Sequence, residues 1–243
     1  MVRRGEPPPH AVLTADTGDR ENGKMGEKPE TYAYVDMFSG WLQEHGYPPV
    51  TWVRKGGKDE TLEEFCLRLE TLPAIAFGYK TCSQKFKIEP QDKWANNDPV
   101  CQAEWAAGRK VTKIIGYNWD EVHRAQFYDD EKYVRRYPLI DWRIGREQCA
   151  AIILSEGLPL PPKSACFYCP HSKPAEIRAL ARQHPDLLQR ALKIEANAKT
   201  ATTVKGLGRH FSWRDVINQG EMFPEMYDKR ESEMPCGCYD GGT

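Results

Sequence analysis

The sequence predicts an α/β fold with a mainly parallel sheet flanked by helices. Short apolar segments with the character of buried strands alternate with amphipathic segments spaced for helices, and this alternation is typical of parallel α/β proteins. Polar loops follow several of the predicted strands, and ligands of such sheets bind beyond the carboxyl ends of the strands. The loops after residues 15, 53 and 117 are therefore the first places to look for a binding site.

The first part of the chain predicts two strand–helix pairs. Residues 11–15 form a short apolar run that ends in a polar loop, as expected of a buried strand. Pro29 can open a helix in its first turn, and the apolar residues of 31–45 recur on one helical face. Residues 49–53 predict a second strand, and residues 61–69 predict a second amphipathic helix.

The rest of the chain predicts two more strands and two more helices. We expect strands at 111–117 and 137–142 and a helix at 146–156. We also expect a helix at 175–198 that breaks at Pro185, because proline cannot continue the helical hydrogen-bond ladder.

Three prolines between residues 159 and 162 predict an extended link. They divide the chain into a nucleotide-binding-like α/β domain, residues 1–160, and a helical, cysteine-containing region, residues 161–243. We expect the second region to pack on the same domain.

Composition excludes some function classes. The 34 Lys and Arg residues balance the 35 Asp and Glu residues in a chain of 243, which removes the simplest argument for nucleic-acid binding. Two basic stretches, 80–87 and 199–214, leave contact with nucleic acid open, but a solvated surface explains them better. No apolar run approaches the ~20 residues of a membrane span, and no secretory signal is evident, so we expect a cytoplasmic protein without a membrane partner.

Eight cysteines make metal or thiol chemistry the main functional question, because a reducing compartment disfavours disulfides. Cys166 and Cys169 are spaced to grip one metal ion or one edge of a cluster. A redox dithiol, or two buried cysteines beside a turn, are the alternatives. Candidates to complete a metal site are Cys82, Cys236, Cys238 and His171.

The remaining cysteines differ in setting. Cys82 has basic neighbours that favour a thiolate. Cys236 and Cys238, near the C-terminus, can serve as a ligand or a nucleophile, or have no role. Cys66 and Cys149 lie on apolar helix faces and are interpreted as core residues.

Two loops offer groups to a nucleotide. Asp16, Thr17 and Gly18 at a strand end present a carboxylate and backbone N–H groups to a nucleotide or Mg²⁺, although their spacing alone favours a turn with Asx-type hydrogen bonds. The second loop carries acidic and basic groups that suit ribose and phosphate, or else a helix N-terminus; it contains Gly116, Asp120, Glu121 and Arg124.

Taken together, these segments resemble phosphoadenosine phosphosulfate (PAPS) reductase-like proteins, especially phage and bacterial members, of the adenine nucleotide α-hydrolase or PP-loop superfamily. Asp16-Thr17-Gly18 followed by Pro29-Glu30-Thr31 is similar to the family's DTG…PET stretch. The loop from Gly116 to Arg124 is similar to its IG…DE..R segment, and residues 163–170 are similar to its later Cys-x-x-Cys-Pro part. The resemblance covers residues 11–215, and the order and spacing of the motifs carry it.

The resemblance implies a Rossmann-like fold and an enzyme that couples an adenine nucleotide, PAPS or ATP with Mg²⁺, to sulfur transfer or sulfonucleotide reduction. Zinc or an iron–sulfur cluster would be held by Cys82, Cys166 and Cys169, with Cys238 as a fourth ligand. Cys236 would attack the sulfur, and a thioredoxin-like partner would then reduce the product. The nucleotide would be bound by Asp16, Thr17, Gly18, Gly116, Asp120, Glu121 and Arg124.

One departure keeps other hypotheses open. The family's first strand and its S-G-G-x-D-S phosphate loop are expected before Ala11, and the sequence does not contain them. We therefore expect either a start set too far downstream or a truncated member. The alternative functions are ATP-dependent PP-loop thiolation or modification of a nucleic acid or small molecule, and a degenerate, metal-stabilised binding module without catalysis.

Overall fold

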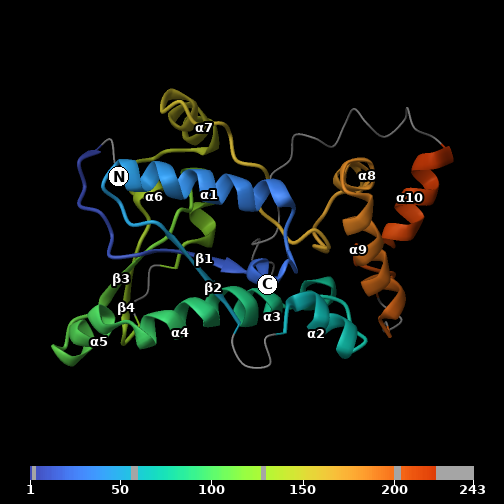
Figure 1. The fold of residues 1–243 in the computed structure, drawn as a ribbon, viewed down its shortest axis with the longest axis horizontal. Coiled ribbons are helices and arrows are strands. Elements are labelled where there is room, and N and C mark those ends of the chain that lie inside the picture. The colour runs from blue at the N-terminus through green and yellow to red at the C-terminus, as the bar shows by residue number, and fades with distance from the viewer. Residues whose placement is uncertain (2–3, 56–59, 127–129, 200–203, 223–243) are drawn as a thin grey trace.

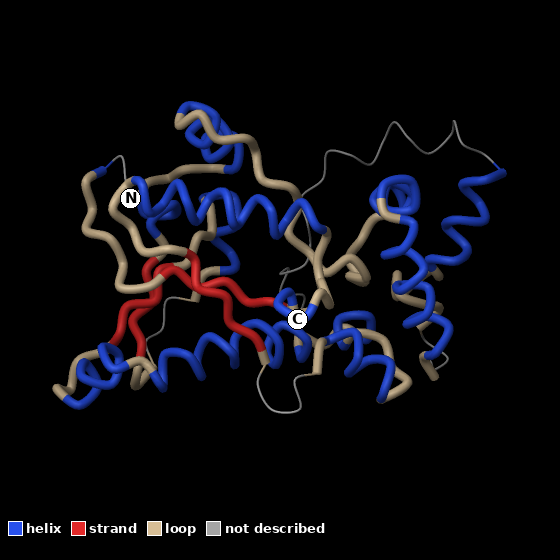
Figure 2. Tube along the Cα trace, in the orientation of Figure 1, coloured by secondary structure: helices blue, strands red, loops and turns tan. Residues whose placement is uncertain are grey.

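The computed structural model describes residue 1 and residues 4–55, 60–126, 130–199 and 204–222. Its strands form two parallel pairs: β1 (Val12–Asp16) with β2 (Val50–Arg54), and β3 (Val111–Ile114) with β4 (Tyr133–Arg136). The described chain is thus a mixed α/β structure, and the predicted parallel pairing is confirmed (Figure 2). Within the described ranges the strands make two small sheets instead of one continuous sheet.

Helices cover both faces of the β1–β2 pair (Figure 1). On one side lies α1 (Pro29–Glu44), which Pro29 opens, and on the other lies α4 (Glu89–Asn97), which contacts both strands. Tyr32 of α1 stacks on Trp52 of β2 with 5.3 Å between ring centroids. The predicted helix over 31–45 and the predicted strands at 11–15 and 49–53 are confirmed.

Local capping signals place the ends of several helices. The helix predicted at 61–69 is α2 (Leu62–Arg68), and Thr61 and Glu64 close its first turn with a capping box. The helix predicted at 146–156 is α7 (Arg146–Ser155), and Gly157 follows it with φ of +73°. The helix predicted at 175–198 is α8 (Pro174–Gln183) and α9 (Pro185–Asn197), separated at Pro185 as expected.

The strand predicted at 137–142 is wrong. That segment forms the short helix α6 (Pro138–Asp141), and the strand is β4, just before it. Pro138 occupies the first helical turn, where its fixed φ is favourable and its missing N–H matters least. Two arginines make the segment of β4 look polar in the sequence. In the fold each is paired with a carboxylate, Arg135 with Asp130 and Arg136 with Glu6.

The middle of the chain, which the sequence pattern left unassigned, is largely helical. Short helices lead from α2 into α4, and a π-helical turn precedes α4 directly. The other elements are η2 (Arg20–Asn22), η3 (Ala74–Phe77), α3 (Thr81–Ser83), η4 (Gln84–Ile88), α5 (Pro99–Ala106), η5 (Trp119–Arg124) and α10 (Trp213–Met222). None of the described helices is long and apolar enough to cross a membrane.

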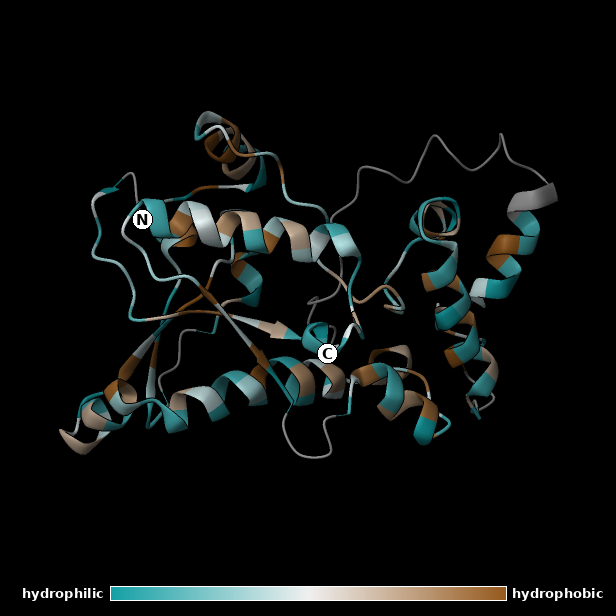
Figure 3. Ribbon diagram, viewed as in Figure 1, coloured by the Kyte–Doolittle hydropathy of each residue, from teal (hydrophilic) through white to brown (hydrophobic). Residues whose placement is uncertain are grey.

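The main hydrophobic core lies where α2 meets the three helices of the C-terminal region (Figure 1). Hydrophobic residues are interspersed among hydrophilic ones along α8, α9 and α10, as expected of helices with one buried face (Figure 3). The core therefore draws residues from both sides of residue 160. Its largest fully buried side chains include Phe86, Tyr168, Ile177, Ile194, Leu207 and Trp213.

We predict that this core dominates stability. Leu187→Ala on α9, where the side chain is buried, should lower the free energy of unfolding by about 2–5 kcal/mol. The matched change Leu154→Ala on α7, where the leucine is 57% exposed, should change it by no more than about 0.5 kcal/mol. Urea titration followed by circular dichroism measures both, and equal effects would contradict the assignment of the core.

Candidate functional site

The turn after β1 is organised by the carboxylate of Asp16. Its Oδ1 accepts hydrogen bonds from the backbone N–H of Gly18 at 2.8 Å and from the Tyr32 hydroxyl at 2.7 Å. Its Oδ2 accepts one from the N–H of Arg20 at 2.9 Å. Burial raises the pKa of Tyr32, which keeps that phenol protonated as a donor. Asp16 thus forms the Asx-type turn that its spacing alone favoured. Both of its carboxylate oxygens accept hydrogen bonds from groups of the protein itself.

Gly18 is required by a close approach of two backbone segments. A Cβ atom at Gly18 would lie 2.2 Å from the carbonyl oxygen of Lys24 and 2.3 Å from the backbone nitrogen of Gly26. A Cβ atom at Gly26 would in turn lie 2.5 Å from the hydroxyl of Thr17. The two glycines let the turn after β1 fold tightly against residues 24–26.

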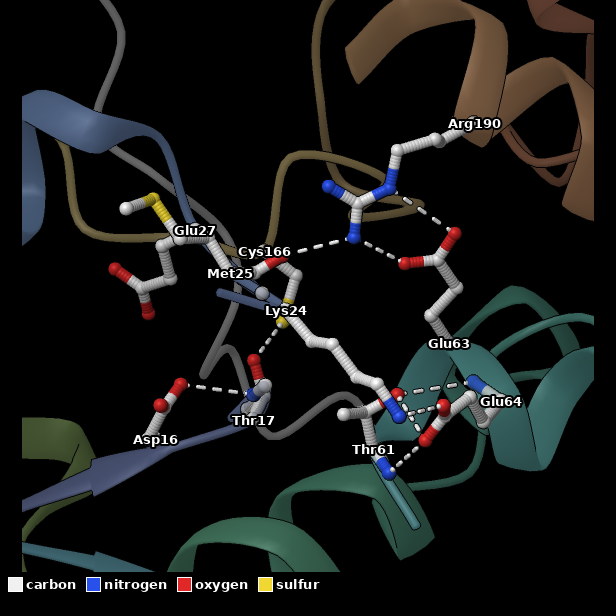
Figure 4. A network of polar contacts seen from close by, with 12 residues as sticks. Asp16, Thr17, Lys24, Met25, Glu27, Thr61, Glu63, Glu64, Cys166 and Arg190 are labelled. Atoms are coloured by element: carbon white, nitrogen blue, oxygen red, sulfur yellow. Dashed lines mark hydrogen bonds and ion pairs between the residues drawn. The ribbon is translucent and has the colours of Figure 1, made fainter. Parts of the chain in front are cut away.

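The loop that carries Cys166 docks onto this turn (Figure 4). The backbone N–H of Phe167 donates to the carbonyl of Gly26 at 3.1 Å, and Cys166 makes a β-bridge with Glu27. The hydroxyl of Thr17 lies 3.2 Å from the Sγ of Cys166. Thr17, predicted to bind a nucleotide, is therefore placed against the thiol.

Three predicted metal ligands line one small cavity of about 40 Å³. Cys82 comes from α3, and Cys166 and Cys169 come from the loop before α8. The sequence expectation that these three cysteines share a site is consistent with this placement. The cavity is also lined by Thr17, Leu62, Lys87, Ser164 and Tyr168.

Burial controls the state of these thiols. It raises the pKa of Cys166 to about 12 and also raises that of Cys169, while the ammonium of Lys87 acts in the opposite direction on both. Among the described residues, no three Cys, His, Asp or Glu side chains are arranged so that they could hold a metal ion as they stand. The thiol donor set still suits zinc or an iron–sulfur cluster, since both take cysteine thiolates.

A larger cavity of about 290 Å³ runs along β1, with α1 on one side and the η4–α4 segment on the other. Lys87 and Ser164 line both cavities and so connect the larger one to the thiols. Glu27 also lines it; its carboxylate accepts a hydrogen bond from the Ser164 hydroxyl at 2.9 Å, and burial raises its pKa. Aromatic walls are provided by Tyr32, Tyr34 and Trp52.

The second predicted nucleotide loop is built as a helix start. Asn118 and Glu121 form a capping box at the beginning of η5, and Asp120 accepts a hydrogen bond from the backbone N–H of Arg146 at 2.8 Å. Arg124 pairs with Glu121 and lies over the ring of Tyr117.

Neither cavity is lined by Gly116, Asp120, Glu121 or Arg124, so the structure does not bring the two predicted nucleotide loops together there. The predicted nucleophile Cys236 and the predicted fourth ligand Cys238 lie outside the described residues.

Sequence reasoning missed several residues of the two cavities. Lys87 lies at the end of a basic stretch that was interpreted as a solvated surface, and Ser164 precedes the Cys-x-x-Cys pair by two positions. Glu27 immediately precedes Lys28 and Pro29, within the segment that resembles the family's PET motif, so that signal was available. Nothing local in the sequence marks Trp52 or Tyr168 as cavity residues.

No family model, curated protein or solved structure matches the chain.

We predict that the two candidate nucleotide-binding glycines differ in structural role. Gly18→Ala should destabilise the fold by about 1–3 kcal/mol or more, because its Cβ would overlap backbone atoms that cannot move alone. Gly116→Ala should leave stability nearly unchanged, because a Cβ there meets open space. Thermal unfolding of the two variants decides the point, and a harmless Gly18→Ala would refute the close backbone contact.

Proposed function

We propose that this chain binds an adenine nucleotide and performs sulfur chemistry on it, as a PAPS reductase-like enzyme with a Rossmann-like arrangement of its strands. One observation carries the proposal. Cys82, Cys166 and Cys169 line a cavity that shares Lys87 and Ser164 with a larger cavity beside β1. A ligand in the larger cavity would therefore have its charged end next to a cation and a group of thiols.

The larger cavity has the composition of a small-molecule site. It combines aromatic and aliphatic walls with a few polar groups, and its volume is near the lower end of ligand cavities, roughly 300–1,000 Å³. The ammonium of Lys87 suits a phosphate or sulfate group. We propose that the nucleotide occupies this cavity with its phosphate or sulfonate directed to Lys87.

The thiol cavity would hold the metal centre. Bound zinc or an iron–sulfur cluster would organise the loop around Cys166 and keep its cysteine ligands in the thiolate form. Cys82, Cys166 and Cys169 would be its ligands, and the ammonium of Lys87 favours the thiolate form of Cys166 and Cys169.

The reaction implied by the resemblance needs an accessible thiolate, for which Cys236 is the candidate. Its sulfur attacks the sulfonate sulfur, the bond from that sulfur to the bridging phosphate oxygen breaks, and the nucleotide leaves with the electron pair. The product on the protein is an S-sulfocysteine. A thioredoxin-like dithiol then reduces it, which releases sulfite, restores the Cys236 thiol and leaves a disulfide on the partner.

We predict that Lys87→Met weakens nucleotide binding about 10–100-fold, because a charge-assisted contact to phosphate contributes roughly 1.5–3 kcal/mol. Lys93→Met on α4 is the matched control: it removes the same charge from an exposed position that does not line the cavity. Isothermal titration calorimetry with PAPS, ATP and adenosine bisphosphate measures the effect. Equal affinities of the two variants would place the nucleotide elsewhere.

We also predict that the anaerobic full chain, given PAPS and a reduced thioredoxin, releases sulfite and that Cys236→Ser abolishes the release. Cys149→Ser on α7, away from both cavities, should keep it. Pyrophosphate release from ATP without sulfite from PAPS would favour the ATP-dependent modification enzyme instead. Metal without nucleotide affinity would favour the non-catalytic binding module.

A further inference from the structure

Within the described chain, two carboxylates line the larger cavity beside β1, those of Asp16 and Glu27. Both residues are buried, at 4% and 7% exposed. The two oxygens of Asp16 already accept hydrogen bonds from the turn after β1 and from α1. Glu27 differs, because among the described residues only the Ser164 hydroxyl donates to its carboxylate, at 2.9 Å from Oε2. Its Oε1 is therefore available to a further donor.

The surrounding backbone fixes where the Glu27 carboxylate lies. The N–H of Glu27 donates to the Tyr32 hydroxyl at 3.3 Å, and Glu27 forms a β-bridge with Cys166. Ser164, which holds the side chain, belongs to the same loop as Cys166 and lines both cavities. The acceptor is thus in place before a ligand arrives, which reduces the entropy that binding costs.

Lys87 lies close enough to Glu27 to act on it electrostatically. Burial raises the pKa of the Glu27 carboxyl, whereas the ammonium of Lys87 and the hydrogen bond from Ser164 act in the opposite direction. A ligand hydroxyl that donated to Oε1 would favour the ionised carboxylate further. The cavity therefore places an acceptor for a hydroxyl group beside the cation that suits a phosphate.

A second residue of the cavity wall also lacks a partner. Thr31, in the first turn of α1, is 7% exposed and lines the same cavity. Its hydroxyl has no hydrogen-bond partner among the described residues. A buried hydroxyl without a partner is unfavourable, and a polar group of a bound ligand would remove that cost. Independently of Glu27, this hydroxyl indicates that a polar ligand completes the wall.

We infer that Glu27 binds the 2′-hydroxyl of the nucleotide ribose and makes the cavity selective for ribonucleotides over 2′-deoxyribonucleotides. The inference rests on the proposed function and deepens it, because it adds the sugar to the phosphate assigned to Lys87. Acidic side chains bind ribose hydroxyls in other nucleotide-binding α/β folds. The 2′-hydroxyl is free in both ATP and PAPS, whereas PAPS carries on its 3′ oxygen a phosphate that a buried carboxylate would repel.

The test measures the affinity of the full chain for ATP, 2′-deoxyATP and 3′-deoxyATP by isothermal titration calorimetry. We expect 2′-deoxyATP to bind about 10–100-fold more weakly than ATP, because it lacks a hydrogen bond to a charged group. We expect 3′-deoxyATP to bind within about 3-fold of ATP, because it retains that hydrogen bond.

Two variants of Glu27 assign the preference to its carboxylate. Glu27→Gln keeps the size of the side chain and removes its charge, so the preference for ATP over 2′-deoxyATP should fall about 5–10-fold. Glu27→Ala removes the acceptor and should leave a preference of about 2-fold or less. Glu44→Gln is the matched control, since Glu44 ends α1, is exposed and lines neither cavity; its preference should equal that of the wild type. Each preference is a ratio measured on one protein, so a lower folded fraction does not change it.

Three results would overturn the inference: equal affinities of the wild type for ATP and 2′-deoxyATP, a greater loss with 3′-deoxyATP than with 2′-deoxyATP, or an unchanged preference in the two Glu27 variants. In each of these cases, ATP binding that depends on Lys87 would leave the proposed function standing. Absence of any nucleotide binding by the wild type would instead overturn both, so the two failures are distinguishable.

Discussion

The contact between the turn after β1 and the loop around Cys166 is the constraint on which the rest of the site depends. It needs two glycines, because only Gly18 and Gly26 allow the backbones of residues 17–18 and 24–26 to approach so closely. The Cys166 loop packs against these two backbone segments. The N–H of Phe167 donates to the carbonyl of Gly26, and Cys166 forms a β-bridge with Glu27. Helices α8 and α9 continue from that loop, so this joint positions the C-terminal helices relative to β1 and β2.

Ion pairing reinforces the joint from the other side. Arg190 of α9 pairs with Glu63 of α2, donates to the carbonyl of Met25 at 3.0 Å, and lies 4.6 Å from the ring centroid of Phe167 (Figure 4). One guanidinium therefore connects α2, the glycine-rich turn and the Cys166 loop. Because those segments also line the thiol cavity, the geometry of the cavity is set by long-range packing and not by the Cys-x-x-Cys loop alone.

Sequence reasoning succeeded where the signal was local. Capping residues, prolines and apolar runs located helices and strands within a few residues. Strand β4 was missed because its arginines make the segment look polar, and in the fold they are paired with Asp130, five residues before Arg135, and with the distant Glu6. The sequence named Cys82 as one of four candidates to join the Cys166 loop, and only the family resemblance favoured it over the others. The Asp16 motif looked the same whether it bound a ligand or its own backbone, and only the hydrogen bonds separate the two. Cys66 was interpreted as a core residue, and its side chain is buried in the main core. The sequence of α2 alone does not reveal which residues of other elements surround it.

The burial of the described thiols bears on which chemistry they suit. A thiol whose pKa is raised by desolvation is a poor nucleophile at neutral pH, because the thiolate is the reactive form. A metal reverses this preference, since it binds the thiolate directly and releases the proton. The burial that makes Cys166 and Cys169 poor candidates for attacking a sulfonate is thus compatible with the metal centre proposed for them. In the proposed reaction, ligand and nucleophile would therefore be different cysteines, and the nucleophile would come from a thiol outside the buried cavity.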